Sequence, residues 1–379
     1  MNLLLPLLLA PATRFLVVGG GPNPANNQVA LEFNVQHFAR ILPKDAPYRV
    51  LFADGDAGTA TVRFTPEGQT PGLKDQYKQP QLPRLDGAAS LENVNREIAS
   101  LASGGKTPVF LYFTGHGTIP KPPNPRLSSF NLWKFENFTA VDFARSLTSF
   151  PKDVPIVALM VQCHSGGFAK SLFKDGDPDQ PPLNNRFCGF YASIESRSAA
   201  GCTPSINTKS YRDFTTYFVA ALAGEDRQGQ KVSGADYDGN GKVGMNEAFC
   251  YALVNDDSID TPVCTSDEFV RRVVKMPEEE IFATPYSSVL KMATPAQRGA
   301  LEALSTSAGL KGEDRLAVAF ENYPSLGSRD SMDRIRGFRF VRLAKTVVMG
   351  SKMASHSDAA LRRRYETLIK DEAANPLRP

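Results

Sequence analysis

Apolar runs and amphipathic stretches alternate along roughly the first 275 residues. Five short runs rich in apolar residues have the pattern of strands, and they span 14–20, 48–55, 107–117, 154–162 and 186–194. Helical spacing of apolar positions separates them, at 26–42, 90–103, 138–150, 165–173 and 211–224. The strand runs are apolar at nearly every position, as in strands covered on both faces. The sequence therefore predicts an α/β fold, a doubly wound and mostly parallel sheet with helices on both faces.

Two connecting segments and the C-terminal part have a different pattern. Residues 56–88 and 118–130 are rich in Gly, Pro and polar residues, and we expect them to be loops. Beyond residue 280, helical patterns such as AALRRRYETLIKDEAA continue without a convincing strand. We therefore expect one domain over residues 13–280 and a helical C-terminal extension over residues 281–379.

Reactive side chains follow two of the predicted strands. One strand ends in TGHG and another in CHSGG, so that His116 and Cys163 come directly after buried runs. Ligands bind beyond the carboxyl ends of the strands of a parallel sheet, and if the two strands are neighbours both side chains reach one edge. A nearby imidazole or helix N-terminus turns a thiol into a nucleophile near neutral pH. The backbone N–H groups of Gly117 and Cys163 are then placed to stabilise a developing oxyanion.

The same residues also have plainer interpretations. A single histidine at a strand end is often a hydrogen-bonded core residue, and a lone buried cysteine is usually inert. A zinc site made by His116, Cys163 and His164 is a further alternative. It is disfavoured because neighbouring side chains point apart where a chain leaves a strand.

Together, LYFTGHGT and VQCHSGGF resemble the caspase-like cysteine peptidases of the His–Cys dyad clan. Cys-His-Ser-Gly after a strand is similar to metacaspases, whereas FLVVGGGPNPANNQVALE is similar to the legumain-like branch, particularly its bacterial members. The caspase signature Gln-Ala-Cys-x-Gly is only partly matched, because His164 and Ser165 follow the cysteine. The resemblance covers roughly residues 14–275.

The resemblance implies a caspase-like fold and a cysteine endopeptidase that forms a thioester with a peptide or protein substrate. In it, His116 is the general base, Cys163 is the nucleophile, and the amides of Gly117 and Cys163 form the oxyanion hole. The alternatives are a catalytically silent binding or regulatory module and a transpeptidase that passes the same thioester to an amine. Either Glu195 or Arg197 could line the S1 wall or face solvent, so no P1 residue is assigned.

Asn26 and Asn27 stand where legumains place polar residues that support the histidine. Asn27 also suits a helix cap, because asparagine is among the preferred capping residues.

The segment DYDGNGKVGMNE, residues 236–247, matches the EF-hand calcium loop position by position. Gly241 falls at position 6, where the backbone turns sharply. The ligands at positions 1, 3, 5, 7 and 12 are Asp236, Asp238, Asn240, the carbonyl of Lys242, and Glu247. We predict a Ca²⁺ site that stabilises the structure. The other interpretation is an acidic turn that caps the next helix.

Residues 1–12 hold a short apolar run and a small-x-small site, a signal-peptide pattern without the usual basic start. Four of the five cysteines form two pairs fourteen residues apart. In an exported protein this spacing predicts Cys188–Cys202 and Cys250–Cys264 disulfides, with four buried thiols as the alternative. We therefore expect a secreted or periplasmic protein, or else a cytoplasmic one.

The remaining composition excludes two classes of partner. No apolar run is long enough to span a membrane. The net charge of +3, with no extended basic tract, predicts no nucleic-acid partner.

Overall fold

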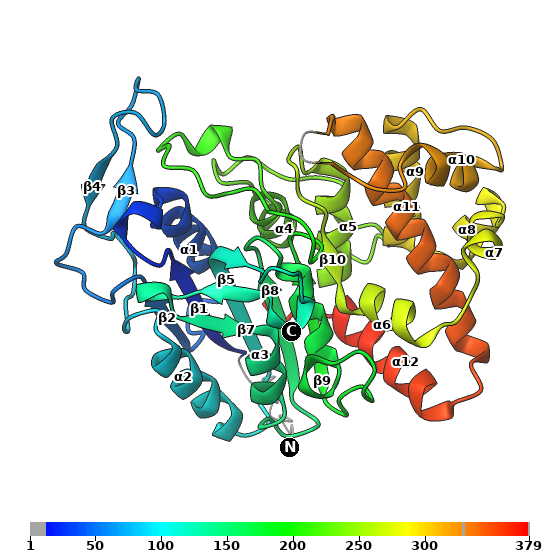
Figure 1. Cartoon of the computed structure of the whole chain (residues 1–379), viewed down its shortest axis with the longest axis horizontal. Helices are drawn as coiled ribbons and strands as arrows, with labels where there is room; N and C mark the ends of the chain where they lie inside the picture. Colours follow the sequence, from blue (N-terminus) through cyan, green and yellow to red (C-terminus); the bar gives the residue numbers. More distant parts are fainter. Residues whose placement is uncertain (1–12, 328–329, 378–379) are drawn as a thin grey trace, which may run out of the picture.

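The structure of the chain is a computed structural model that describes residues 13–327 and 330–377. Its centre is a sheet with the strand order β10-β9-β8-β5-β1-β2 (Figure 1). The parallel strands are β1 (Arg14–Gly20), β2 (Tyr48–Phe52), β5 (Val109–Thr118), β8 (Pro155–Met160) and β9 (Arg186–Tyr191). β10 (Val263–Cys264) is antiparallel to β9. The predicted α/β class with a mostly parallel sheet is confirmed, and the predicted signal peptide lies outside the described residues.

Helices cover both faces of the sheet. Phe38 of α1 (Val29–Ile41) packs on Tyr112, with ring centroids 4.5 Å apart. Phe143 of α3 (Ala140–Leu147) packs on Phe113 at 6.4 Å. Successive side chains of a strand point to opposite faces, so these neighbouring residues of β5 show a helix on each side. The contacts place α4 (Phe214–Ala223) and α5 (Met245–Asn255) with α1, and α2 (Leu91–Ser103) with α3.

Helix capping agrees with the sequence at one position and differs at another. Ser90 caps α2 by accepting a backbone N–H at 3.3 Å. The predicted cap role of Asn27 is wrong, because Gln28 is the N-cap of α1. Asn27 is buried, and its side chain accepts from the N–H of Gly21 and donates to the carbonyl of Thr61. It therefore ties the end of β1 to a neighbouring segment.

Short strands that were not predicted lie in the first predicted loop and at the end of the second. β3 (Val62–Phe64) and β4 (Gln76–Lys78) form an antiparallel hairpin that projects from one end of the molecule (Figure 1). β6 (Ser129–Asn131) and β7 (Asn137–Thr139) extend from the end of β5. Each has three residues, which is too short to show an alternating pattern. The helix expected at 165–173 is the 3-10 helix η4 (Ser165–Leu172).

The C-terminal part is helical, as predicted. Its helices are α6 (Thr265–Val273), α7 (Glu278–Phe282), α8 (Tyr286–Met292), α9 (Pro295–Ser307), α10 (Arg315–Asn322), α11 (Met332–Ser351) and α12 (Ala359–Ala373). In Figure 1, α7 to α11 lie beyond β10, and α12 returns to β9. One continuous cluster of buried residues runs from Phe15 to Leu377, so the expected boundary at residue 280 does not separate two cores. None of the described helices is both long and apolar enough to cross a membrane.

Candidate functional site

The pairing of β5 with β8 brings the two predicted strand ends together. Phe113 pairs with Met160, and the N–H of Val161 continues the ladder by donating to the carbonyl of Phe113 at 3.1 Å. A Cβ on Gly117 would fall 2.1 Å from the carbonyl oxygen of Cys163, so this approach requires a glycine. The TGHG and CHSGG segments therefore meet at the carboxyl edge of the sheet.

The imidazole of His116 is oriented by the segment that follows β1. Its Nε2 lies 2.8 Å from the carbonyl oxygen of Asn26. The side-chain amide of Gln28 lies beside it, with its nitrogen donating to the same Asn26 oxygen at 2.6 Å and its oxygen accepting from Arg63 at 3.2 Å. A carbonyl only accepts hydrogen bonds, so we assign the proton to Nε2, which leaves the lone pair on Nδ1. A Cβ on Gly21 would lie 1.8 Å from the same Asn26 oxygen, which explains the glycines after β1.

Burial sets the charge of His116. The pKa of the imidazole is lowered from its ordinary value because burial disfavours the cation, and the nearby Arg63 lowers the pKa further. The hydrogen bond to Asn26 acts in the opposite direction. The lowered pKa keeps the imidazole neutral near pH 7, which is the form that can accept a proton from a thiol.

The sulfur of Cys163 is held by a backbone segment that follows β9. The N–H of Ala199 points at Sγ at 3.3 Å, and Sγ lies 3.7 Å from the carbonyl oxygen of the same residue. The amide N–H of Cys163 itself has no acceptor within residues 13–327 and 330–377. No hydrogen bond joins the thiol to His116 in this part of the chain, and such contacts are often loose before substrate binds.

We call residues 195–200 the thiol wall, because they wrap the turn that carries Cys163. His164 has a left-handed backbone with φ of 60°, which is costly for a residue other than glycine and typical of functional sites. Its N–H donates to the carbonyl of Arg197 at 2.9 Å, and its Nδ1 pairs with the carbonyl oxygen of Glu195 at 2.8 Å. His164 therefore joins the thiol wall to the turn that carries Cys163. Among the described residues, no metal-binding cluster includes His116, Cys163 or His164, the residues of the zinc alternative.

The structure does not bring Glu195 and Arg197 together at a pocket. The carboxylate of Glu195 pairs with Lys170 at 3.2 Å. Arg197 bonds the carbonyl of Gly327 at 2.6 Å and lies 3.7 Å from Asp330. Both side chains therefore have charged partners, and neither lines the small cavity beside the thiol wall, so the S1 role considered for them stays a prediction.

A different pair of acids lines a narrow cavity of about 10 Å³ beside the thiol wall, together with Gly201 and Cys202. Asp213 caps α4 through Oδ1 at 2.9 Å, and Arg227 lies 4.0 Å from that oxygen. The other oxygen lies 3.6 Å from where a Cβ of Gly201 would be.

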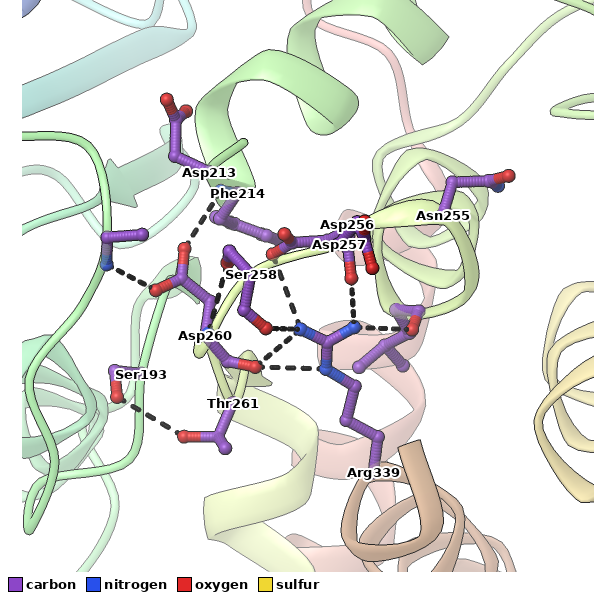
Figure 2. A network of polar contacts seen from close by, with 12 residues as sticks. Ser193, Asp213, Phe214, Asn255, Asp256, Asp257, Ser258, Asp260, Thr261 and Arg339 are labelled. Atoms are coloured by element: carbon purple, nitrogen blue, oxygen red, sulfur yellow. Dashed lines mark hydrogen bonds and ion pairs between the residues drawn. The ribbon is translucent and has the colours of Figure 1, made fainter. Parts of the chain in front are cut away.

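The second acid, Asp260, is fully buried between two elements (Figure 2). Its carboxylate accepts the N–H of Ala200 at 2.6 Å and the N–H of Phe214 at 2.9 Å. Asp213 and Asp260 were not foreseen from the sequence, and the acidic run NDDSID at 255–260 is the signal that could have indicated the latter.

All five cysteines are free thiols, so the predicted disulfides are wrong. Cys188 is paired with Val157 in the middle of the sheet, whereas Cys202 lies by the end of β5, 3.8 Å from the carbonyl oxygen of Gly115. Cys188 therefore lies within the sheet and Cys202 at its carboxyl edge, which is why the fourteen-residue spacing does not correspond to a disulfide. Burial raises the pKa values of the four thiols other than Cys163, which keeps them protonated; they are Cys188, Cys202, Cys250 and Cys264.

The predicted calcium loop is wound around its acidic side chains. Ligand oxygens of Asp236, Asp238 and Glu247 lie within 4.8 Å of one another. Asp236 accepts the backbone N–H groups of residues 239–241, and Gly241 has the left-handed φ of 82° that its position in the loop requires. Glu247 also accepts the N–H of the residue before α5 at 2.8 Å, so the capping interpretation is realised as well.

The other two predicted ligands, Asn240 and Lys242, contact each other. The side-chain oxygen of Asn240 accepts the N–H of Lys242 at 2.8 Å. The acidic triad could hold a metal ion, and its geometry does not specify Ca²⁺.

The loop lies at the opposite edge of the sheet from Cys163. A cavity of about 410 Å³ is lined by loop residues together with the first residues of the strands. These lining residues include Asp238, Asn240, Glu247, Val109, Pro155 and Arg186. An ion in the loop would therefore act on the stability of the fold, not directly on the thiol.

Comparison with protein-family models finds no match, and comparison with curated proteins finds none either. Among solved structures, the chain is similar to protein GSU0716 from Geobacter sulfurreducens, with a TM-score of 0.38 and 12% sequence identity. The alignment covers 67% of this chain and 92% of that one. The geometry of the site is therefore the basis for any function of this chain.

Proposed function

We propose that the chain is a caspase-like cysteine endopeptidase, with His116 as general base and Cys163 as nucleophile. The observation that carries this proposal is the meeting of the two strand ends at one edge of the sheet. There, Nε2–H of His116 donates to the carbonyl of Asn26, and the N–H of Ala199 points at the sulfur of Cys163. A neutral imidazole and an amide donor both favour transfer of the thiol proton.

The proposed reaction follows from these positions. Nδ1 of His116 takes the proton of Cys163, and Sγ attacks the carbonyl carbon of the scissile peptide bond. The oxyanion accepts from the amide of Cys163 and from that of Gly117. The bond to nitrogen breaks as Nδ1–H protonates the leaving amine, and a thioester remains. Nδ1 then removes a proton from water, which hydrolyses the thioester and restores the thiol.

A thiol-reactive probe and a panel of fluorogenic peptides test this proposal. We expect iodoacetamide to label Cys163 in the folded protein, and we expect H116A to slow both labelling and peptide hydrolysis. His356→Ala is the matched control, since His356 lies on the loop before α12. A protein that hydrolyses no peptide with Arg, Lys, Asn or Asp at P1 would contradict the proposal. Transfer to an added amine in place of hydrolysis would indicate the transpeptidase alternative.

We also propose that the loop at 236–247 binds Ca²⁺ and that the ion is structural. Three carboxylates whose ligand oxygens lie within 4.8 Å of one another are a hard-oxygen donor set. Export to the periplasm or the exterior remains a prediction from residues 1–12. In those compartments even a weak site of this kind would be filled.

A further inference from the structure

One arginine of the C-terminal helices is buried without being part of any predicted site. Arg339 lies on α11, its side chain is 1% exposed, and its guanidinium faces the carboxylate of Asp256 at 3.5 Å (Figure 2). The guanidinium donates hydrogen bonds of 2.6 to 3.2 Å to the backbone carbonyls of Leu253, Asp256, Ser258 and Asp260. Burying a guanidinium is costly unless its donors are satisfied, and here one side chain satisfies four carbonyls.

We call residues 256–261 the Arg339 loop. This loop holds the thiol wall near both of its ends. The carboxylate of Asp260 accepts the N–H of Ala200, and Oγ1 of Thr261 lies 3.2 Å from Oγ of Ser193 and 3.3 Å from the N–H of Ile194. Those contacts surround the segment whose Ala199 backbone touches the sulfur.

We propose that Arg339 is a positioning residue for the candidate active site. Its side chain fixes the Arg339 loop, the loop fixes Asp260, and Asp260 fixes Ala200. The neighbouring N–H of Ala199 is thereby kept on Sγ of Cys163. This inference rests on the proposed function, because it concerns the same thiol. It also makes α11 a component of the site, although 176 positions separate Arg339 from Cys163.

Variants at both ends of this chain of contacts test the proposal. Arg339→Met removes the donors while keeping an unbranched side chain, and Arg339→Lys retains some of them. Asp260→Asn keeps the volume but replaces one acceptor oxygen with a donor nitrogen. The matched control is Arg336→Gln, because Arg336 lies on the same helix and pairs with Asp257 of the same loop at 3.2 Å, yet is partly exposed.

Two readouts separate positioning from general stability. The first is the pH profile of Cys163 alkylation by iodoacetamide in folded protein, which we expect to move to higher pH in R339M and D260N because the amide no longer faces the sulfur. The second is peptide hydrolysis, for which we expect kcat to fall by about 10- to 100-fold with little change in KM. R339K should recover part of both, and R336Q should match the wild type.

The outcomes decide the proposal whether or not the first variant folds. Folded R339M or D260N with the wild-type alkylation profile and kcat would overturn it, because the buried contacts would then serve stability alone. If R339M does not fold, R339K and D260N carry the same comparison. The alkylation readout needs no peptide substrate, so a wild-type protein that hydrolyses nothing would remove the proposed function and still leave this inference to be decided by alkylation.

Discussion

The imidazoles of His116 and His37 are both largely buried, but they have different hydrogen-bond partners. His116 presents Nε2 to a carbonyl and, in the proposed mechanism, uses Nδ1 to accept the thiol proton, whereas His37 of α1 is inside the fold. Nδ1 of His37 contacts Arg40 at 2.9 Å, and its Nε2 is buried without a partner among the described residues. Burial, together with the charges of Arg227 and Arg40, lowers the pKa of His37 to about 2.

This pKa predicts that His37 makes the fold acid-sensitive. Above about pH 6.5 the side chain is neutral in both the folded and the unfolded protein. Below that pH the unfolded chain binds a proton that the folded protein refuses, so stability falls by up to about 1.4 kcal/mol per pH unit. We expect the loss of unfolding free energy between pH 7 and pH 5, measured by urea denaturation, to be about 2 kcal/mol smaller in His37→Leu than in the wild type.

The same comparison contains its control. His356→Ala removes an imidazole from the loop before α12 and should leave the pH dependence unchanged. Parallel slopes for H37L and the wild type would contradict the prediction. Comparing variants is necessary because burial raises the pKa values of Asp256, Asp260 and Glu372, and these groups change stability in the opposite direction on acidification.

The sequence indicated His116 and Cys163 because strand ends of a parallel sheet have a known place in the fold. It could not indicate Ala199, which contacts the sulfur through its backbone and therefore has no side-chain signature. The sequence also could not indicate Arg339, since an arginine within a helix normally lies on a solvent-exposed face. Its role depends on contacts with residues about eighty positions away.

At the scale of elements, the loop at 236–247 is joined to the end of the chain. The N–H of Met245 donates to the carbonyl of Ala374 at 3.1 Å, and the side chain of Asn375 donates to the carbonyl of Val243 at 2.8 Å. Ordering of the loop by an ion should therefore stabilise the segment after α12 as well as the start of α5.

Calcium is expected to raise the stability of the whole chain through this loop. At a concentration 100 times the Kd, binding to the folded state contributes about 2.7 kcal/mol, which thermal unfolding detects as an increase in Tm. Asp238→Asn should remove most of this increase while leaving Tm without calcium nearly unchanged, since Asp238 is exposed. Glu366→Gln removes an exposed acid of α12 and serves as the control. An equal increase in wild type and D238N would refute a site in this loop.

Elements were predictable in proportion to their length. The apolar runs predicted five parallel strands of five to ten residues, and the helical spacing predicted α1 to α4, of eight to thirteen residues, because elements of this length reveal a pattern. The hairpins β3–β4 and β6–β7 offered three residues per strand and no period. The disulfide prediction failed for a similar reason, since regular spacing of cysteines gives no information about where the intervening strand places each thiol.

At the scale of the whole molecule, the C-terminal helices complete the fold. Arg364 of α12 donates to the carbonyls of Leu183 and Phe187, at 3.1 and 3.2 Å. Arg186 at the start of β9 pairs with Asp371 of α12. An alternative role for this part is a cover that blocks the active site of a precursor until it is removed. Contacts that continue the main core favour a permanent role.

Removal of α11 and α12 should consequently abolish the folded protein, not activate it. A chain that ends at residue 330 loses the donors of Arg339 and exposes apolar side chains that α11 and α12 now cover, so we expect aggregation and no peptide hydrolysis. Co-expression of residues 331–379 as a separate polypeptide is the control, and it should restore soluble protein because the same buried contacts can form between two chains. A soluble truncated protein that hydrolyses peptides faster than the full chain would show instead that these helices are inhibitory.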